Sequence, residues 1–216
     1  RDTGTWRAGV WVRDSSAGIG TLTFTDPEHA TFAGLGHAVS DTDTGEAFAL
    51  LSGEIVPVAI RAVRKGAAGS PGELKGEFSG TAMGTVRAND ATGVYGVLTG
   101  AAPAGEALPV ANIQEVAPGD AEILVTLSGT EPQRYAVRIE RVDLTAADPN
   151  RNLLLRVTDE RLLQTTGGIV QGMSGSPIVQ NGRLVGAVTH VLVNDPARGY
   201  GIFAATMLEK ADAAAG

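Results

Sequence analysis

The sequence predicts an all-β protein with one short helix at its C-terminus. Short runs rich in β-forming residues dominate the chain, and clusters of Gly, Pro, Ser and Asp separate them. The clearest helical signal is at 206–214, where Thr206 is a candidate N-cap followed three residues later by Glu209. Many short strands, turn signals and one terminal helix are typical of a β-barrel or a β-sandwich.

The first half of the chain contributes several candidate strands. Glycine accounts for 29 of the 216 residues, and 43% of the residues are hydrophobic, which indicates a globular, turn-rich protein. The runs that we interpret as strands in this half are 5–12, 19–25, 47–51, 54–63 and 92–98.

The stretch 101–118 is rich in Ala, Pro and Gly, and we interpret it as the connection between two halves of a single domain, about 1–105 and about 106–216. After it, 121–127 and 134–142 predict a hairpin. In the second arm of this hairpin, apolar side chains alternate with polar or small ones, which is the period-two pattern of a half-buried strand.

Composition and charge exclude several classes of function. Lys plus Arg is 17 and Asp plus Glu is 24, so the net charge is −7, and we expect no nucleic-acid partner. The absence of cysteine excludes disulfides and thiolate chemistry. No signal peptide is present, and no apolar run approaches the ~20 residues of a transmembrane helix. Because the chain begins at Arg1 rather than Met, we expect a fragment or a processed form.

The segment 172–177, Gly-Met-Ser-Gly-Ser-Pro, predicts a catalytic nucleophile at Ser174. Small neighbours allow a substrate carbonyl to approach the hydroxyl and allow backbone N–H groups to converge on an oxyanion. The expected oxyanion donors are the N–H groups of Gly172 and Ser174. The alternative is an ordinary Gly/Ser loop. An α/β-hydrolase elbow is disfavoured, because its Gly-x-Ser-x-Gly pattern requires glycine at position 176, where this chain has serine.

The residues after this turn make the catalytic interpretation stronger. A short strand leads into Asn181-Gly182, the strongest two-residue hairpin signal, and a second strand follows. Together these features resemble the second barrel of chymotrypsin-like serine peptidases. In such a barrel the strand 186–191 would line the specificity cleft, so Thr189 and His190 are candidate substrate-binding residues. The alternative for His190 is a half-exposed strand histidine without a function.

A serine nucleophile needs a neighbouring base, and the chain has three histidines. His29 lies in a polar turn, and we expect it to be exposed. His37 lies between small residues and follows an apolar segment. It also precedes Ser174, as the base does in peptidases whose triad follows the chain order His, Asp, Ser. We therefore interpret His37 as the base.

Five longer segments resemble the stage IV sporulation protein B peptidases. The resemblance runs from about Trp11 to about Gly201. The segments that carry it are Val-Arg-Asp-Ser-Ser-Ala-Gly-Ile-Gly-Thr-Leu-Thr (12–23), Gly-Leu-Gly-His-Ala-Val-Ser-Asp (34–41), Thr-Asp-Glu-Arg-Leu-Leu (158–163), Gly-Gly-Ile-Val-Gln-Gly-Met-Ser-Gly-Ser-Pro (167–177) and Thr-His-Val-Leu-Val-Asn-Asp-Pro (189–196).

This resemblance implies a chymotrypsin-like double β-barrel that needs neither metal nor cofactor and acts outside the cytoplasm. By position it implies His37 as base, Ser174 as nucleophile and Asp159 as the acid of a catalytic triad. Members of the family normally carry an N-terminal membrane segment and a PDZ domain, and we expect this chain to be the peptidase domain alone.

The residues themselves leave several candidates for the acid. Asp159 precedes Ser174 by only 174 − 159 = 15 positions, whereas the acid of most two-barrel peptidases lies far from the serine in sequence. The alternative role for Asp159 is a helix N-cap, because Arg-Leu-Leu follows closely. Asp41 and Asp43, just after His37, are the other candidate acids.

The leading functional hypothesis is a serine endopeptidase that acts in sporulation signalling. The resemblance implies that it cleaves itself and a regulator of a membrane-embedded protease. One alternative is a non-catalytic or weakly catalytic protein-binding module on a peptidase fold. The intact set of His37, Ser174 and Gly172 argues against it, since a binding module has no chemical need for all three. An esterase that uses the same nucleophile is a second alternative.

Overall fold

The computed structural model describes residues 17–40, 46–47 and 52–215. The expected strand at 5–12 lies outside these residues, as does most of the one at 47–51. The described elements of the first half are β1 (Leu22–Asp26), β2 (Thr31–Gly34), β3 (Glu54–Ile55), β4 (Val58–Arg64), β5 (Glu73–Phe78), β6 (Gly84–Asp90) and β7 (Gly93–Leu98).

The predicted connection 101–118 contains a short 3₁₀ helix (Ile113–Glu115), and the elements of the second half follow it. These are β8 (Gly119–Val125), β9 (Gln133–Val142), a 3₁₀ turn (Pro149–Arg151), β10 (Leu153–Val157), α1 (Glu160–Thr166), β11 (Pro177–Gln180), β12 (Arg183–Leu192), β13 (Asp195–Phe203) and α2 (Ala204–Ala215).

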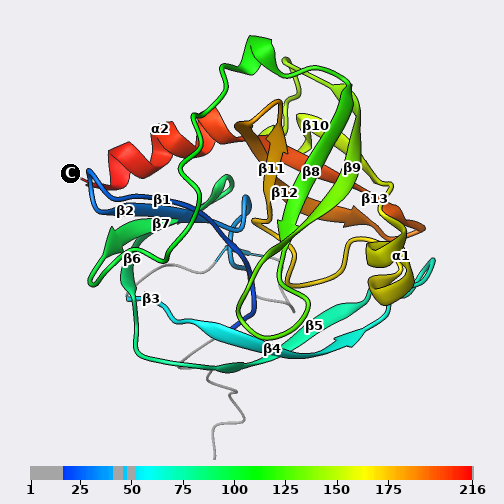
Figure 1. The fold of residues 1–216 in the computed structure, drawn as a ribbon. Coiled ribbons are helices and arrows are strands. Elements are labelled where there is room, and N and C mark those ends of the chain that lie inside the picture. The colour runs from blue at the N-terminus through cyan, green and yellow to red at the C-terminus, as the bar shows by residue number, and fades with distance from the viewer. Residues whose placement is uncertain (1–16, 41–45, 48–51, 216) are drawn as a thin grey trace, which may run out of the picture.

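Strands dominate the structure, which confirms the all-β prediction, and they form a closed barrel, an open sheet and the separate two-stranded β4–β5 hairpin (Figure 1). The barrel has the strand order β10-β13-β12-β11-β8-β9 and belongs wholly to the second half. The first half forms the sheet β1-β2-β7-β6-β3. This sheet does not close among the described residues, because its edge strand β3 has only two residues and pairs with β6 alone.

The helix α2 covers the open sheet. Met207 and Ala211 of the helix are completely buried and form one cluster with Ala33 of β2 and Tyr95 of β7. The helix begins at Ala204, so Thr206 lies inside its first turn and is not its N-cap, contrary to the sequence-based prediction. No helix among the described residues is long and apolar enough to cross a membrane.

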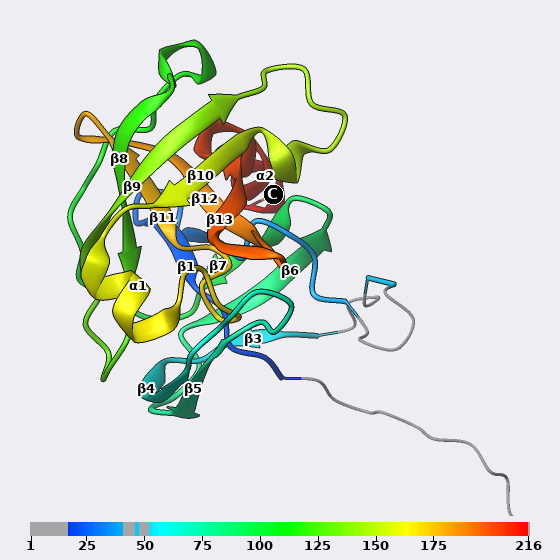
Figure 2. The same ribbon diagram turned by 90° about the vertical axis from the view of Figure 1, so that its right-hand side faces the viewer.

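The β4–β5 hairpin comes from the first half of the sequence but packs against the barrel. It extends along the base of the molecule, below α1 (Figures 1 and 2). Ile60 and Leu74 are buried in the same core cluster as the apolar side chains of the barrel strands. The two halves are therefore linked by a shared core as well as by the chain.

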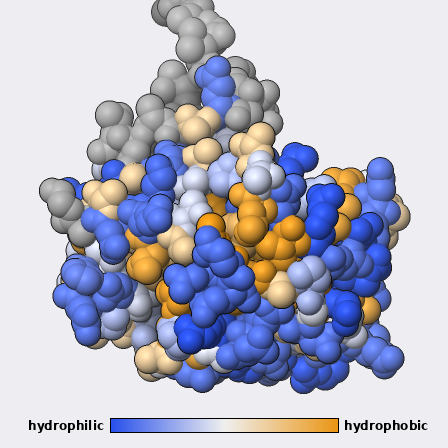
Figure 3. Space-filling model, turned by 90° about the horizontal axis from the view of Figure 1, so that it is seen from above, coloured by the Kyte–Doolittle hydropathy of each residue, from blue (hydrophilic) through white to orange (hydrophobic). Residues whose placement is uncertain are grey.

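Two local predictions of the second half are confirmed. Asn181 and Gly182 have φ of 51° and 73°, as a two-residue hairpin turn requires, and they join β11 to β12. In β9, Tyr135, Val137 and Ile139 are buried while the residues between them face outward. Seen from above, most of the molecular surface is hydrophilic, with apolar atoms gathered near the middle of that face (Figure 3).

The core of the open sheet depends on close packing between Phe32 and Gly96. Phe32 is completely buried, and the two residues face each other across β2 and β7. A Cβ atom at Gly96 would lie 2.9 Å from two ring carbons of Phe32 and 2.1 Å from the Thr85 carbonyl oxygen. Only a residue without a side chain fits there.

We expect Gly96→Ala to lower the free energy of unfolding by about 1–3 kcal/mol, because overpacking forces neighbouring atoms to move. Thermal unfolding followed by circular dichroism measures this loss. Gly100→Ala is the matched control, since a Cβ at Gly100 meets no atom within 4 Å. Equal melting temperatures for the two variants would contradict this packing account.

Candidate active site

The turn that holds Ser174 leads into β11, and its shape depends on glycine. Gly172 and Gly175 have φ of 97° and 90°, in a region that side chains strongly disfavour. Within the turn, the Met173 N–H donates to the Val170 carbonyl over 3.1 Å, and the Ser176 N–H donates to the Met173 carbonyl over 2.9 Å. The segment is therefore a tightly hydrogen-bonded turn and not a loose loop.

The two serines of the turn differ in accessibility. Ser176 is completely buried, and its hydroxyl has no hydrogen-bond partner among the described residues. Ser174 is half-buried, and its Oγ donates to the carbonyl oxygen of Thr189 over 3.0 Å. Only Ser174 can meet a substrate without a rearrangement of the turn.

Two threonines of the first half hold the turn from the side of the open sheet. The Thr21 N–H donates to the Ser174 carbonyl over 2.8 Å, and Thr21 Oγ1 donates to the Gly172 carbonyl over 3.1 Å. Thr23 Oγ1 donates to the Gly175 carbonyl over 2.8 Å. These bonds join segments more than 150 positions apart in the sequence.

Two backbone N–H groups of this turn have no hydrogen-bond partner among the described residues. The carbonyls from Gln171 to Gly175 each accept a hydrogen bond, and the N–H groups of Met173, Gly175 and Ser176 each donate one. Among the described residues, the N–H groups of Gly172 and Ser174 have no such partner. These are the two groups predicted to form the oxyanion hole, and such donors must be free to receive an oxyanion.

His37 follows β2 and lies against the segment that contacts Ser174. A Cβ atom at Gly36 would lie 2.9 Å from Thr189 Cγ2, so the chain before His37 packs directly on Thr189. Nδ1 of His37 is 2.8 Å from the carbonyl oxygen of Ala38. Because a carbonyl only accepts, Nδ1 carries the proton, and Nε2 is left with the lone pair that a general base requires.

Asn89 of β6 fixes the loop just after His37. Its side chain accepts a hydrogen bond from the Val39 N–H over 2.8 Å and donates one to the Val39 carbonyl over 2.9 Å. This paired contact ties the loop to the open sheet, so we assign Asn89 a positioning role for His37.

His190 lies beside His37, with ring centroids 5.0 Å apart and planes tilted by 36°. Partial burial lowers the pKa of His190, as does the positive charge that His37 carries when it is protonated, while Asp148 acts in the opposite direction. The neighbouring Thr189 is buried, and its Oγ1 donates to the Asn150 carbonyl over 2.7 Å.

Ser174, His37 and His190 thus gather around Thr189, although the Ser174 hydroxyl is bonded to the Thr189 carbonyl and not to a histidine. Catalytic hydrogen bonds are often absent or long when no substrate is bound and form only in the substrate complex. A rotation about the Cα–Cβ bond of Ser174 would break its bond to Thr189 and redirect the hydroxyl.

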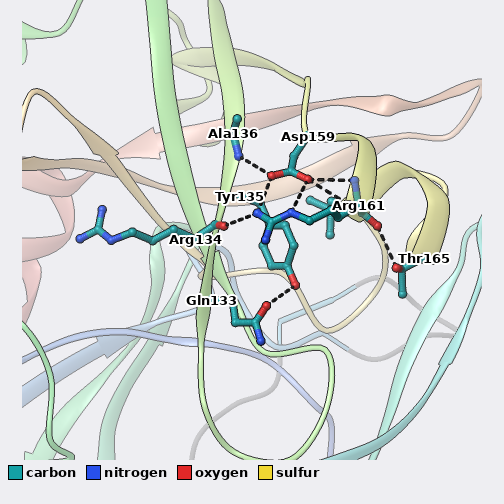
Figure 4. A network of polar contacts seen from close by, with 8 residues as sticks. Gln133, Arg134, Tyr135, Ala136, Asp159, Arg161 and Thr165 are labelled. Atoms are coloured by element: carbon teal, nitrogen blue, oxygen red, sulfur yellow. Dashed lines mark hydrogen bonds and ion pairs between the residues drawn. The ribbon is translucent and has the colours of Figure 1, made fainter.

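The structure places Asp159 at the N-cap of α1, which is the alternative that the sequence left open. Its carboxylate accepts hydrogen bonds from the N–H groups of Arg161, Leu162 and Ala136 and pairs with the Arg161 guanidinium over 2.8 Å (Figure 4). The guanidinium also lies over the Tyr135 ring, 5.1 Å from its centroid. The hydrogen bond from Arg161 contributes most to a pKa of about 2 for Asp159.

This arrangement corrects the expected triad. No hydrogen bond joins Asp159 to His37 in the described structure, because its oxygens are taken up by the cap and by Arg161, while Nδ1 of His37 faces the Ala38 carbonyl. The other two candidates, Asp41 and Asp43, lie outside the described residues.

One group of potential metal ligands lies together among the described residues, away from the nucleophile turn. Asp26 at the end of β1 and His29 in the following turn meet Asp212 of α2, with ligand atoms within 4.8 Å of one another. His29 is exposed, as the sequence predicted, and its Nδ1 is paired with Asp26. This group adjoins neither Ser174 nor His37 in the contacts of the structure.

The sequence did not reveal Thr21, Thr23, Asn89 or Leu74 as parts of the site. Thr23 lies in β1 and Thr21 immediately precedes it, and nothing local in the sequence shows that they meet residues 172–175. Such contacts depend on how the two halves dock, which no short motif encodes.

The chain is similar to crystal structures of the Rv3671c protease from M. tuberculosis. The active form shares 17% identity and has a TM-score of 0.45, and the match covers 96% of this chain and 95% of that chain. An inactive mutant form shares 19% identity and has a TM-score of 0.44, over 72% of this chain and 86% of that chain. No curated protein matches the chain.

The family comparison is much more extensive. The profile of the SpoIVB peptidase S55 family matches residues 4–208, which include every residue of the site described above. The chain therefore belongs to the SpoIVB peptidase S55 family, a family of serine peptidases.

Proposed function

We propose that the protein is a serine endopeptidase in which Ser174 is the nucleophile and His37 the general base. The observation that carries this assignment is that the N–H groups of Gly172 and Ser174 have no hydrogen-bond partner among the described residues, in the same turn as the half-buried Ser174. Backbone donors arranged in this way stabilise the oxyanion that forms when serine attacks a carbonyl. Membership of a peptidase family implies that the carbonyl belongs to a protein substrate.

The reaction has two steps, acylation of Ser174 and hydrolysis of the acyl-enzyme, and His37 transfers the proton in both. Ser174 Oγ attacks the scissile carbonyl carbon while His37 Nε2 takes the hydroxyl proton, and the resulting oxyanion is bound by the N–H groups of Gly172 and Ser174. His37 then gives the proton to the leaving amine, which leaves an acyl-enzyme. A water molecule, activated by His37, hydrolyses the acyl-enzyme and restores the serine.

The edge of β12 offers a site for an extended peptide. β12 pairs with β11 only up to Ala187, and the Ser176 carbonyl accepts from the Val188 N–H. From Thr189 onward, this edge has no partner strand among the described residues. A substrate segment could therefore add to the sheet through main-chain hydrogen bonds, with His190 beside it.

Substrate binding of this kind would also prepare the nucleophile. The Thr189 carbonyl now accepts from the Ser174 hydroxyl over 3.0 Å, and a substrate N–H at this edge would compete for the same oxygen. Displacement of the hydroxyl would free it to turn toward His37. The base is held ready by the Ala38 carbonyl, which takes the orienting position usually occupied by a carboxylate.

We place this activity in sporulation signalling outside the cytoplasm, because of the family and the five segments that resemble stage IV sporulation protein B peptidases. The substrates proposed on this basis are the protein itself and a regulator of a membrane-embedded protease. The same resemblance supports a longer form with a membrane segment and a PDZ domain.

We expect Ser174→Ala to abolish cleavage of β-casein and self-cleavage, because loss of a triad nucleophile typically lowers the rate on the order of 10⁶-fold. Its melting temperature should stay close to that of the wild type, since only one hydrogen bond of a half-buried side chain is lost. Ser176→Ala is the control and should keep its activity. Loss of activity in Ser176→Ala with full activity in Ser174→Ala would move the nucleophile to Ser176.

For Asp159 we expect a stability effect and little effect on catalysis. Asp159→Ala should lower the free energy of unfolding by about 1–2 kcal/mol through loss of the N-cap, while Asp159→Asn keeps a capping side chain and should lose less. Both variants should keep the kcat of the wild type. A large fall in kcat for Asp159→Asn at an unchanged melting temperature would restore Asp159 as the acid that orients His37.

The pH dependence of stability provides a further check on Asp159. Its pKa of about 2 in the folded protein lies below the ordinary value of 3.8. A lowered carboxyl pKa stabilises the folded state fully above the unfolded-state pKa, and this contribution is lost as pH falls through the folded-state pKa. Between pH 4 and pH 2, the wild type should therefore lose more stability than Asp159→Asn, as urea unfolding at each pH would measure. Equal losses of unfolding free energy in the wild type and in Asp159→Asn would contradict the ion pair between Asp159 and Arg161.

For His190 we expect a role in substrate choice. His190→Ala should change which bonds of β-casein are cut and raise KM for some peptides, because the ring lies beside the free edge of β12. Labelling of Ser174 by a small phosphonofluoridate should be nearly unchanged, as this probe does not extend along the edge. Loss of labelling in His190→Ala, with normal labelling in His37→Ala, would show that His190 is the base.

A further inference from the structure

The two free N–H groups of the oxyanion hole are oriented by different parts of the chain. In a trans peptide group, the C=O and the N–H point in opposite directions, so a bond to the carbonyl fixes the direction of the following N–H. The Ser174 N–H belongs to the peptide group whose carbonyl, that of Met173, accepts from Ser176 within the turn. This donor is therefore positioned locally.

The Gly172 N–H depends instead on the β4–β5 hairpin. Its peptide group carries the Gln171 carbonyl, which accepts from the Leu74 N–H over 2.9 Å. The Gln171 N–H in turn donates to the Gly72 carbonyl over 3.0 Å, so residues 72–74 hold Gln171 from both sides in a short parallel bridge. If the 171–172 peptide group turned over, the Gly172 N–H would leave the oxyanion hole.

The hairpin packs closely against the 171–172 peptide group. A Cβ atom at Gly72 would be 2.6 Å from Val170 Cγ1, and one at Gly172 would be 3.0 Å from Leu74 Cβ. Leu74 itself is buried in the barrel core. These short distances leave no room for a side chain at Gly72 or Gly172, so the hairpin packs directly against the segment 170–172.

Further contacts anchor the hairpin tip on both sides of the site. The Gly66 N–H donates to the Thr166 carbonyl at the end of α1, and Lys65 Nζ donates to the Gln164 carbonyl. The Gly69 N–H donates to the Val193 carbonyl over 2.8 Å, just beyond the free edge of β12. The hairpin tip therefore contacts both the end of α1 and the residue that follows β12, the strand that we propose binds substrate.

We propose that the β4–β5 hairpin is the element that forms the oxyanion hole, through the hydrogen bond from the Leu74 N–H to the Gln171 carbonyl. Docked, the hairpin holds the Gly172 N–H toward the substrate carbonyl; released, it lets the 171–172 peptide group turn over, and the peptidase loses one oxyanion donor. Leu74 is a positioning residue that acts through its backbone. This inference rests on the proposed roles of Ser174 and Gly172.

The test replaces Leu74 by its α-hydroxy acid, which substitutes an ester for the amide and removes the N–H while keeping the side chain. The matched control is the same replacement at Gly69, which removes a hairpin–barrel hydrogen bond that does not involve the 171–172 peptide group. Two readouts are compared in the whole chain: hydrolysis of p-nitrophenyl acetate and the ¹H–¹⁵N resonance of Gly172.

The Leu74 ester should lower kcat about three- to tenfold, the effect of one lost hydrogen bond on the orientation of the peptide group. The fall cannot exceed the roughly 10²- to 10³-fold loss expected when an oxyanion donor is removed altogether. KM should stay unchanged, because the interaction is made only in the transition state. The Gly172 resonance should shift in the Leu74 ester and stay in place in the Gly69 ester, which should also keep kcat.

Other outcomes overturn the proposal in distinguishable ways. If the two esters behave alike in both readouts, the hairpin does not orient this peptide group, and the proposal fails while the assignment of Ser174 stands. If the Gly172 resonance shifts without a change in kcat, Gly172 is not an oxyanion donor. If the wild type does not hydrolyse the ester and Ser174 cannot be labelled, the proposed function itself fails, and the inference fails with it.

Discussion

The orientation of the peptide groups between Gln171 and Ser176 is the constraint on which the proposed active site depends. Each peptide group is planar, so the direction of an N–H is set by whatever holds the carbonyl on its opposite side. Every carbonyl in this run is held, and the N–H groups of Gly172 and Ser174 are left without a partner among the described residues. The proposed oxyanion hole consists of these two N–H groups, whose directions are set by the hydrogen bonds that the preceding carbonyls accept.

This constraint explains why the two halves of the chain must be packed together. The barrel supplies the nucleophile turn, but Thr21 and Thr23 beside the open sheet, and Leu74 in the hairpin, supply donors to its carbonyls. The first half also supplies His37, whose loop Asn89 secures. A change that loosens the contact between the halves would therefore impair the proposed oxyanion hole and the proposed base together, without altering Ser174 itself.

The position of Asp159 shows how a sequence resemblance and a structure can point to different roles. The segment 158–163 is part of the resemblance to stage IV sporulation protein B peptidases, from which an acid at Asp159 follows. In the structure, the same carboxylate caps α1 and binds Arg161, which accounts for its lowered pKa. The carbonyl of Ala38 takes the place of the acid at Nδ1 of His37.

The features predictable from the sequence were those with a local physical cause. Alternation identified β9, and the need for positive φ identified the Asn181-Gly182 turn. The small residues around Ser174 predicted a nucleophile there, and the structure shows the tight turn that holds this serine. The prediction missed β5, whose segment Glu73–Phe78 is mostly charged or glycine and forms a strand through pairing with β4. Leu74 and Thr21 act through contacts about 100 and 150 positions away, which only the docked halves create.

The central claim is that Ser174 is a nucleophile activated by His37. The most direct measurement is to treat the native chain and His37→Ala with a phosphonofluoridate and to locate the modified residue by mass spectrometry. The account predicts a single label on Ser174 in the native chain, formed at a much lower rate in His37→Ala and absent after denaturation. A label on another residue, or one on Ser174 that forms equally fast without His37, would contradict it.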